Sequence, residues 1–411
     1  MHRISYLATV ASAALLGASL SGIALAAAPS KTISFAFWGD TQEHTAMVAA
    51  VAAFDRAHPN IHVTAEWVTG NYNEKILTEL AGGDAPDVMQ ISNADLPGYT
   101  QAFQPIKHLN ASPYLDVRLV NELKVKGTLY AYPFDVNPKV TVINVGLFKQ
   151  DHVPLPSLTT PMTPAQFKSD AMKLTHGTGK TEVFGSAPLW YGDWVYMFGG
   201  RFFNNAGTQC LLGSKQDIAA ANFVINSSTK FKYAPTAKEA AGQNTFDWFL
   251  SGKVATYTDT GPWYLPTLLT AKGLQWELIP EPGYSPFAEV DGLAVNRASK
   301  ESAVANEFAK WMSTAPAAQA AIGESTQAGY VPVVKAAVPG FLKTDPGHNL
   351  QAFITAAENN VHDGEPTIKS NQINSEMWDD FDNATAMGSG SQAPSKVFPK
   401  IARQIDALLQ P

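Results

Sequence analysis

The arrangement of residues 32–68 constrains the fold of this chain more than any other feature. The segment reads "TISFAFWGDTQEHTAMVAAVAAFDRAHPNIHVTAEWV", with a strand-like run at each end. Between the two runs, Asp40 and Glu43 form a capping box that predicts the start of a helix. Apolar residues recur at helical spacing from Met47 to Phe54 and give that helix one apolar face. A strand, an amphipathic helix and a second strand in this order predict a parallel pair of strands.

The same order of elements returns along the chain. Residues 71–84, "NYNEKILTELAGGD", predict a helix that ends at two glycines, and residues 87–92, "DVMQIS", predict a short buried strand. In the second half, Thr163 and Gln166 form a capping box for another helix, and "EVFGSAPL" predicts a strand over 182–189. We therefore expect an α/β protein in which each sheet is mostly parallel and flanked by helices.

Residues 1–28 have the three-part layout of a secretory signal peptide. His2 and Arg3 precede an apolar run rich in Ala, Ser and Gly, and small residues close it, so cleavage is expected after Ala26 or Ala28. A membrane anchor is the alternative interpretation of this run. No Cys lies near the cleavage site, so a lipid anchor is not supported. We expect the mature chain in the periplasm or outside the cell.

Length, cysteine content and charge narrow the class further. About 380 mature residues are enough for two globular units with their own cores. Cys210 is the only cysteine, so no internal disulfide can form and packing must provide the stability. A formal net charge of −7, with scattered Lys and Arg, argues against a nucleic-acid partner.

The stretch "HGTGKT" at residues 176–181 looks like the end of a phosphate-binding loop. The loop pattern requires a glycine five residues before Gly179, where this chain has Leu174. A helix also precedes the stretch and a strand is expected after it, which reverses the order that the loop needs. Gly177 suits the left-handed end of a helix, so we predict a helix-ending turn. We find no pattern for a metal site or a catalytic nucleophile, and we expect no cofactor and no metal.

Aromatic, acidic and amide side chains accumulate where predicted strands end. In open α/β sheets, ligands bind at the carboxyl ends of the strands. Rings that stack on C–H faces, together with acceptors for hydroxyl groups, suit a carbohydrate. The candidate ligand-binding residues are Trp38, Asp40, Gln42, Glu43, Ser92, Asn93, Asp135, Trp190, Tyr191, Trp194, Gly261, Trp263, Asp291 and Tyr330.

Several of these residues also have a purely structural interpretation. Asp40 and Glu43 can serve only as helix caps. Trp38 can belong to the core. The aromatic group around Trp190 favours a site lining because it stands beside a Gly-Asp turn, and Trp263 favours one because the helix start does not need its indole.

The order of several segments resembles the bacterial extracellular solute-binding proteins of family 1. These are the maltose-binding-protein-like, sugar-capturing subunits of ABC importers. The segments are "ISFAFWGD", "YNEKILTELAGGDAPDVMQIS", "LYAYPFDVNPKVTVINVGLF", "FLSGKVATYTDTGPWYLP", "VNRASKESAVANEFAKWM" and "AGYVPVV". The resemblance covers nearly the whole mature chain.

The resemblance implies a two-lobed periplasmic-binding-protein fold of class II with a three-segment hinge and the ligand between the lobes. We expect crossovers near 136–140, 291–293 and 329–333. The N-terminal lobe would comprise 29–137 plus 293–330, and the C-terminal lobe 138–292 plus 331–411.

The resemblance also assigns site positions. They are Glu43, Ser92, Asn93, Asp135, Gly261, Trp263, Gly329 and Tyr330. Pro262 separates Gly261 from Trp263, whereas the family more often has Gly and Trp adjacent.

We therefore expect a monomeric, non-enzymatic component that captures a mono- or oligosaccharide and delivers it to membrane permease subunits. A glycerol phosphodiester or a polyol is an alternative solute. A secreted glycan-active enzyme is the rival from another class and would need two carboxyl groups across one glycosidic bond.

Overall fold

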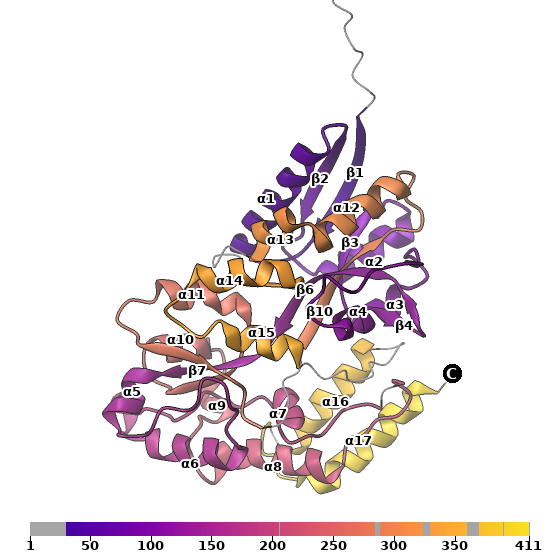
Figure 1. Cartoon of the computed structure of the whole chain (residues 1–411). Coiled ribbons are helices and arrows are strands. Elements are labelled where there is room, and N and C mark those ends of the chain that lie inside the picture. The colour runs from indigo at the N-terminus through magenta and orange to yellow at the C-terminus, as the bar shows by residue number, and fades with distance from the viewer. Residues whose placement is uncertain are drawn as a thin grey trace, which may run out of the picture.

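The computed structural model describes residues 30–204, 206–283, 288–323, 329–359, 370–388 and 390–410. The expected signal peptide, residues 1–28, lies outside the described residues. The fold is α/β with two lobes, and the long strands β6 (Ala131–Pro138) and β10 (Ala288–Val295) lie where the lobes meet (Figure 1). The predicted two-lobed class is confirmed.

The first lobe is built on a six-stranded sheet with the strand order β11-β6-β10-β3-β1-β2. Its other strands are β1 (Lys31–Phe37), β2 (Ile61–Trp67), β3 (Val88–Ser92) and β11 (Val331–Pro332). β1 pairs in parallel with β2 and β3, whereas β10 runs antiparallel to β3 and β6, and β11 runs antiparallel to β6. The expected strands 32–37 and 61–67 are confirmed.

The helix after β1 forms as its sequence predicts. α1 (Thr41–Ala57) begins at Asp40, whose side chain accepts from two backbone N–H groups, and Glu43 returns a carboxylate to the Asp40 backbone. Phe54 on the apolar face meets Phe308 of α12 (Ser302–Thr314) with ring centroids 5.0 Å apart. α1 also packs on α13 (Pro316–Gly323), so this layer fixes the end of β1.

The remaining elements of the first lobe are short. They are α2 (Tyr72–Gly82), α3 (Leu96–Tyr99), α4 (Val117–Glu122) and the hairpin β4 (Lys124–Val125) and β5 (Thr128–Leu129). α2 ends at Gly83, which has a φ of 86° and is the left-handed cap that the sequence predicts.

The second lobe contains a three-stranded sheet in the order β8-β7-β9. Its strands are β7 (Val140–Asn144), β8 (Thr256–Thr260) and β9 (Trp276–Ile279). Both pairings are antiparallel. The expectation of a mostly parallel sheet in each lobe was therefore wrong in strand direction. β7 carries the chain into this lobe and β9 leads back towards β10, so neighbouring strands at the junction run in opposite directions.

The expected strand over 182–189 is also wrong. This segment makes only isolated bridges, from Val183 to His176 and from Phe184 to Val254. A side chain at Gly185 would lie 1.8 Å from the Ala171 carbonyl oxygen, so the backbone packs directly on α6 (Pro164–Leu174). Phe184 and Ala187 still hydrogen-bond to the backbone of residues 253–256, but only an isolated bridge forms there, so the segment is not a regular strand.

Helices form most of the second lobe. They are α5 (Val145–Gln150), α7 (Tyr191–Met197), α8 (Lys215–Thr229), α9 (Ala237–Ala240), α10 (Thr245–Leu250), η2 (Pro262–Tyr264), α11 (Leu265–Thr270), α16 (Ser370–Ala384) and α17 (Pro394–Leu409). α16 packs on α17, and α8 packs on both α7 and α17 (Figure 1).

The stretch "HGTGKT" forms the predicted turn. α6 ends at Leu174, and Gly177 has a φ of 76°. A side chain at Gly177 would lie 2.1 Å from the Thr181 carbonyl oxygen, so the turn requires glycine. Residues 179–181 form one 3₁₀ turn, η1.

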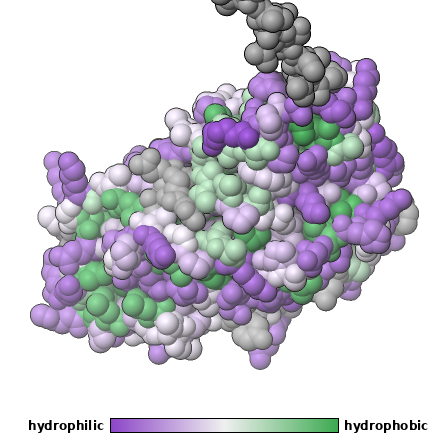
Figure 2. Space-filling model, turned by 45° about the horizontal axis from the view of Figure 1, so that its top comes forward, coloured by the Kyte–Doolittle hydropathy of each residue, from purple (hydrophilic) through white to green (hydrophobic). Residues whose placement is uncertain are grey.

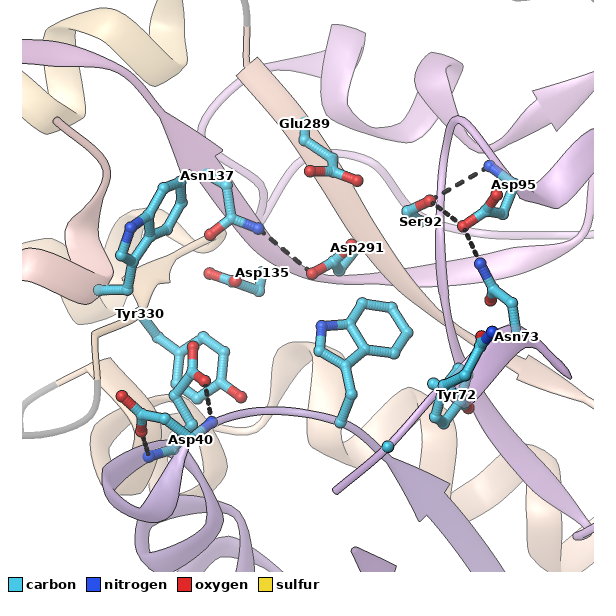
Figure 3. A pocket seen from close by; sticks show the side chains of 15 residues that line it. Asp40, Tyr72, Asn73, Ser92, Asp95, Asp135, Asn137, Glu289, Asp291 and Tyr330 are labelled. Carbon is cyan, nitrogen blue, oxygen red and sulfur yellow. Dashed lines mark hydrogen bonds between the residues drawn. The ribbon is translucent and has the colours of Figure 1, made fainter. Parts of the chain in front are cut away.

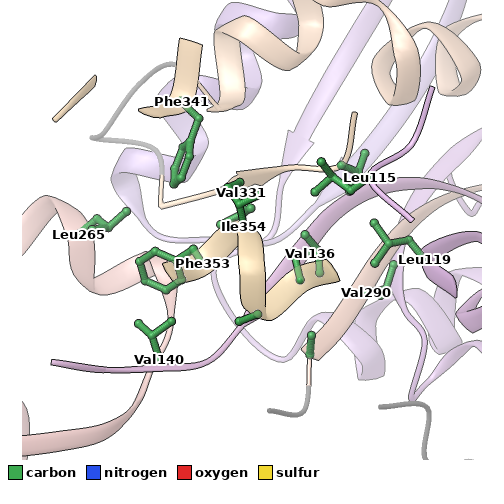
Figure 4. Close-up of a cluster of buried hydrophobic side chains, with 14 of the residues drawn as sticks. Leu115, Leu119, Val136, Val140, Leu265, Val290, Val331, Phe341, Phe353 and Ile354 are labelled. Carbon is green, nitrogen blue, oxygen red and sulfur yellow. The ribbon is translucent and has the colours of Figure 1, made fainter. Parts of the chain in front are cut away.

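A buried apolar cluster surrounds the strands that connect the lobes. Val136 of β6, Val140 of β7 and Val290 of β10 pack with Phe353 of α15 (Gln351–Glu358) (Figure 4). Only Lys139 separates β6 from β7. Val331 follows Tyr330 and joins the same cluster from β11. η3 (Lys335–Ala337) and α14 (Val338–Thr344) come next along the chain. The lobe boundaries given above remain predictions.

The surface in Figure 2 shows hydrophobic residues in separate patches among hydrophilic ones. In the part of the chain that the structure describes, no helix is both long enough and apolar enough to span a membrane.

Candidate functional site

A cavity of about 620 Å³ lies at the ends of the first-lobe strands and is bounded by Trp263 of η2 (Figure 3). It is lined by Trp38, Asp40, Glu43, Gly70, Asn71, Tyr72, Asn73, Ser92, Asp95, Asp135, Asn137, Trp263, Glu289, Asp291 and Tyr330. Trp38 follows β1 and Ser92 ends β3, so both come from carboxyl ends of parallel strands. β10 is antiparallel, and for that reason it contributes Asp291 from its first half.

The structure brings many of the predicted residues to this one cavity. They are Trp38, Asp40, Glu43, Ser92, Asp135, Trp263, Asp291 and Tyr330. They come from segments far apart in the sequence, so only the strand-end argument and the family resemblance connected them.

Three other predicted residues have structural roles beside the cavity. Gln42 is exposed and donates its backbone N–H to the Asp40 carboxylate. Asn93 is buried, and its Oδ1 accepts from the Val290 N–H at 3.1 Å. Gly261 allows the indole of Trp263 to fold back, since a side chain at Gly261 would lie 2.2 Å from that ring.

The aromatic group of α7 does not line the cavity. Trp194 is fully buried and stacks on Phe223 at 4.6 Å, and Tyr191 stacks on Phe381 at 5.1 Å. Every residue of α7 is buried, including Asp193, so this helix belongs to the core. The site interpretation of Tyr191 and Trp194 is therefore corrected to a core role. Trp190 is 51% exposed and its ring lies 5.4 Å from Trp378.

Part of the cavity wall was not predicted from the sequence. Gly70, Asn71, Tyr72 and Asn73 precede or begin α2, and no local pattern marks them as ligand contacts. The sequence contains a pattern that could have identified Asn137 and Glu289 as cavity residues. Each lies two residues from a predicted acid on the same strand, so it points to the same face of the sheet.

Two pairs of polar residues face each other across β6 and β10. Asp135 is opposite Asp291, and Asn137 is opposite Glu289. The Asp291 Oδ2 accepts from the Asn137 Nδ2 at 3.2 Å and from the Gln90 Nε2 at 3.3 Å (Figure 3). The Asp135 Oδ1 accepts from the Val331 N–H at 3.3 Å. The two acids therefore share an amide-lined patch of the wall.

Burial controls the acidity of this wall. It raises the pKa of Asp135 and of Asp291 well above the ordinary value, and repulsion from neighbouring carboxylates adds to the effect. Burial also raises the pKa of Glu43 to about 7, although the backbone N–H of Asp40 opposes the shift. Raised pKa values of carboxyl groups are common at functional sites.

The aromatic side chains are held by specific contacts. The Trp38 ring meets Tyr72 edge-on with centroids 4.8 Å apart. The Lys139 ammonium lies 4.1 Å from the centroid of the Trp263 ring and 2.8 Å from the Asp259 Oδ1. These contacts fix two flat apolar faces beside a wall of hydrogen-bond acceptors.

Among the described residues, no group of three or more His, Cys, Asp or Glu side chains has the geometry to hold a metal ion. The cavity offers two rings and several carboxyl and amide groups, which together can bind a compact polar solute with apolar C–H surfaces.

Comparison with known proteins places this geometry in context. The family model described as bacterial extracellular solute-binding protein matches residues 49–350. The mannitol-binding protein of Pseudomonas aeruginosa is 27% identical over 293 residues, which are 63% of this chain and 63% of that protein. The chain thus spans somewhat less than two thirds of the length of that relative.

Solved structures share the fold. An ABC substrate-binding protein of Listeria monocytogenes, in complex with cycloalternan, superposes with a TM-score of 0.80 at 21% identity and covers 92% of this chain and 99% of its own. The sugar-binding protein MalE of Xanthomonas citri gives a TM-score of 0.77 at 19% identity, with 92% and 97% covered. The GacH receptor of Streptomyces glaucescens gives 0.76 at 22% identity, with 92% and 98% covered.

Proposed function

Since this chain belongs to the bacterial extracellular solute-binding proteins, we propose that it captures a carbohydrate in the cavity between its lobes and delivers it to the permease of an ABC importer. The observation that carries the proposal is the combination of Trp38 and Trp263 with a wall of carboxyl and amide groups.

The chemistry of the wall matches that of a sugar. A pyranose or an extended polyol has C–H faces that pack on indole rings. Its hydroxyl groups donate to carboxylates such as Asp135 and Asp291, and they accept from amides such as Asn73. Each satisfied buried hydrogen bond also discriminates against solutes that lack the hydroxyl.

The names of similar proteins support a polyhydroxylated solute. The relative from Pseudomonas aeruginosa is named for mannitol, and the Listeria protein was solved with cycloalternan. A polyol therefore remains in the same candidate class as a sugar.

A glycerol phosphodiester fits the cavity poorly. Phosphate recognition normally uses Arg, Lys or backbone N–H groups at a helix N-terminus. The described residues that line this cavity include no Arg and no Lys, and the Asp40 carboxylate already accepts from the backbone N–H groups at the start of α1. Six carboxyl groups on the wall would repel the phosphate.

The alternative function, that of a secreted glycan-active enzyme, has less support. The matched family consists of solute-binding proteins. Asp135 and Asp291 are also held in place by hydrogen bonds within the protein. We propose a binding protein without turnover, exported by the segment 1–28 and monomeric.

We also propose that capture involves closure of the lobes. The proposed hinge consists of the crossovers near 136–140, 291–293 and 329–333. The ligand would bind one lobe first and stabilise the closed form, in which Trp263 completes the site.

A thermal-shift panel of monosaccharides, disaccharides, polyols and glycerol phosphodiesters tests the proposal. A solute that binds the folded state raises the melting temperature by mass action. We expect a saturable increase with at least one carbohydrate, and mass spectrometry should recover that compound unchanged. A shift only with a phosphodiester, or cleavage of an oligosaccharide, would contradict the proposal.

A further inference from the structure

The charge of the cavity wall is strongly one-sided. Six of its side chains carry carboxyl groups, namely Asp40, Glu43, Asp95, Asp135, Glu289 and Asp291. No Lys, Arg or His stands among the described residues that line the cavity. A neutral sugar needs acceptors, but it does not need this excess of negative charge.

The excess is greatest where Asp135 and Asp291 lie directly opposite each other on β6 and β10. Like charges at opposed positions of neighbouring strands destabilise a sheet. Both side chains are at least 97% buried, since their exposed fractions are 1% and 3%. The arrangement therefore lowers the stability of the free protein unless a proton or a cation compensates.

One oxygen of each acid has no hydrogen-bond donor among the described residues. Gln90 and Asn137 donate to the Asp291 Oδ2, and the Val331 N–H donates to the Asp135 Oδ1. The Asp291 Oδ1 and the Asp135 Oδ2 are buried and accept from no described residue. Buried carboxylate oxygens without a donor are costly, and here they belong to side chains on the wall of a cavity.

Lys139 interacts with other carboxylates, among them Glu289 of the cavity wall. The Lys139 ammonium pairs with Asp259 at 2.8 Å and lies over the Trp263 ring. Within the described residues it makes no ion pair with Asp135 or Asp291. Compensation of that pair must then come from a proton or from the solute.

We propose that the solute is an amine-bearing carbohydrate, such as an amino sugar or an amino polyol, whose ammonium group binds between Asp135 and Asp291. This inference rests on the proposed function and narrows its ligand class. An ammonium group supplies three donors and a positive charge, whereas a hydroxyl supplies one donor. Trp38 and Trp263 would pack on the rest of the solute.

The test uses compound pairs that differ only in the amine. Isothermal titration near neutral pH compares sorbitol with 1-amino-1-deoxysorbitol, and glucose with glucosamine and N-acetylglucosamine. Chitosan and chitin oligosaccharides extend the comparison to longer chains. Because hydrogen bonds to charged groups are stronger than neutral ones, we expect an amine-bearing member to bind about ten- to a hundredfold more tightly than its neutral partner.

The outcomes separate this inference from the proposed function. Equal or tighter binding of the neutral members overturns the inference and leaves carbohydrate capture intact. Binding of no member, together with no response to the wider panel of carbohydrates, overturns both. A melting shift with calcium chloride alone that matches the shift with the amine also overturns the inference, because the acids would then serve a metal ion.

Single variants place the ammonium group. Asp135→Asn and Asp291→Asn should each reduce the preference for the amine at least tenfold and raise the melting temperature of the free protein. Asp170→Asn, at an ion pair on α6 outside the cavity, should change neither. Circular dichroism confirms folding. An unchanged preference in both cavity variants overturns the proposed position.

Discussion

Trp38 and Trp263 reach the same cavity from different sheets, and this makes single aromatic side chains the sharpest probes of the site. Trp263→Ala should weaken carbohydrate binding by about 1–2 kcal/mol, or roughly five- to thirtyfold, because one stacking surface is lost. Titration calorimetry measures the change. Trp311→Ala is the matched control, since Trp311 packs on Phe54 in the first-lobe core and should affect melting but not affinity. Equal losses of affinity in both variants would contradict the assignment.

Glu281 gives a prediction on pH. Its carboxylate accepts from the Thr141 hydroxyl and the Asp259 N–H at 2.8 Å, yet burial raises its pKa to about 8. Between its ordinary value of 4.5 and about 8, the folded state binds more protons than the unfolded state. Stability therefore decreases as pH rises through this window.

Glu281→Gln should remove part of that decrease. Urea unfolding at about pH 5 and about pH 9 measures it as the difference between the two free energies of unfolding. Glu358→Gln, at an exposed position on α15, should behave as the unmodified protein does. A pH dependence that is the same in all three proteins would refute the role of Glu281.

At the scale of single residues, the sequence predicted the acids at strand ends but not their partners. Asp135 and Asp291 were found because they follow strand-like runs, although the structure places both inside the strands β6 and β10. Asn71 and Asn73 were not, since their approach to the cavity depends on how α2 is placed. Tyr191 and Trp194 were assigned to the site because they form a dense aromatic group beside a Gly-Asp turn, whereas the structure buries every residue of α7.

At the scale of elements, helix caps give a matched pair of variants. Asp40→Ala and Thr163→Ala each remove a side-chain cap, from α1 and α6 respectively, so each should cost about 1 kcal/mol of stability. Only Asp40 lines the cavity, so only Asp40→Ala should also weaken binding. Thermal melts and titrations of both variants check this. Weaker binding in Thr163→Ala would show that general destabilisation, not the site, causes the effect.

Helices and strands with strong local signals were predicted well, whereas the pairing of the strands was not. The capped helices α1 and α6 and the strands β1, β2 and β3 lie where caps and alternation placed them. The strand direction in the second lobe depends on how the chain crosses between lobes, which no local pattern encodes. The segment at 182–189 has strand-like composition and hydrogen-bonds to residues 253–256, but it forms only isolated bridges.

In the whole molecule, we expect the two lobes to close on each other when a carbohydrate binds. Small-angle scattering should show a smaller radius of gyration when a tight carbohydrate is added, because the ligand stabilises the closed form. The Trp38→Ala/Trp263→Ala double variant should show no decrease at the same ligand concentration. An unchanged radius in the unmodified protein at saturation would contradict closure.

The two-lobed arrangement could be predicted only through family resemblance. Hydrophobic periodicity identifies helices and strands one at a time, but the junction is formed by Val136, Val140, Val290 and Phe353, which are scattered over most of the chain. Their convergence is a tertiary property, and so is the cavity beside it.

A titration of the protein with and without its two cavity tryptophans tests whether this cavity captures a carbohydrate. Calorimetry of the unmodified protein and of the Trp38→Ala/Trp263→Ala double variant is run with the carbohydrate that gives the largest thermal shift. We predict one binding site per chain in the unmodified protein and a loss of at least about thirtyfold in affinity in the double variant, from two stacking surfaces. Equal affinity in the two proteins would contradict carbohydrate capture in this cavity.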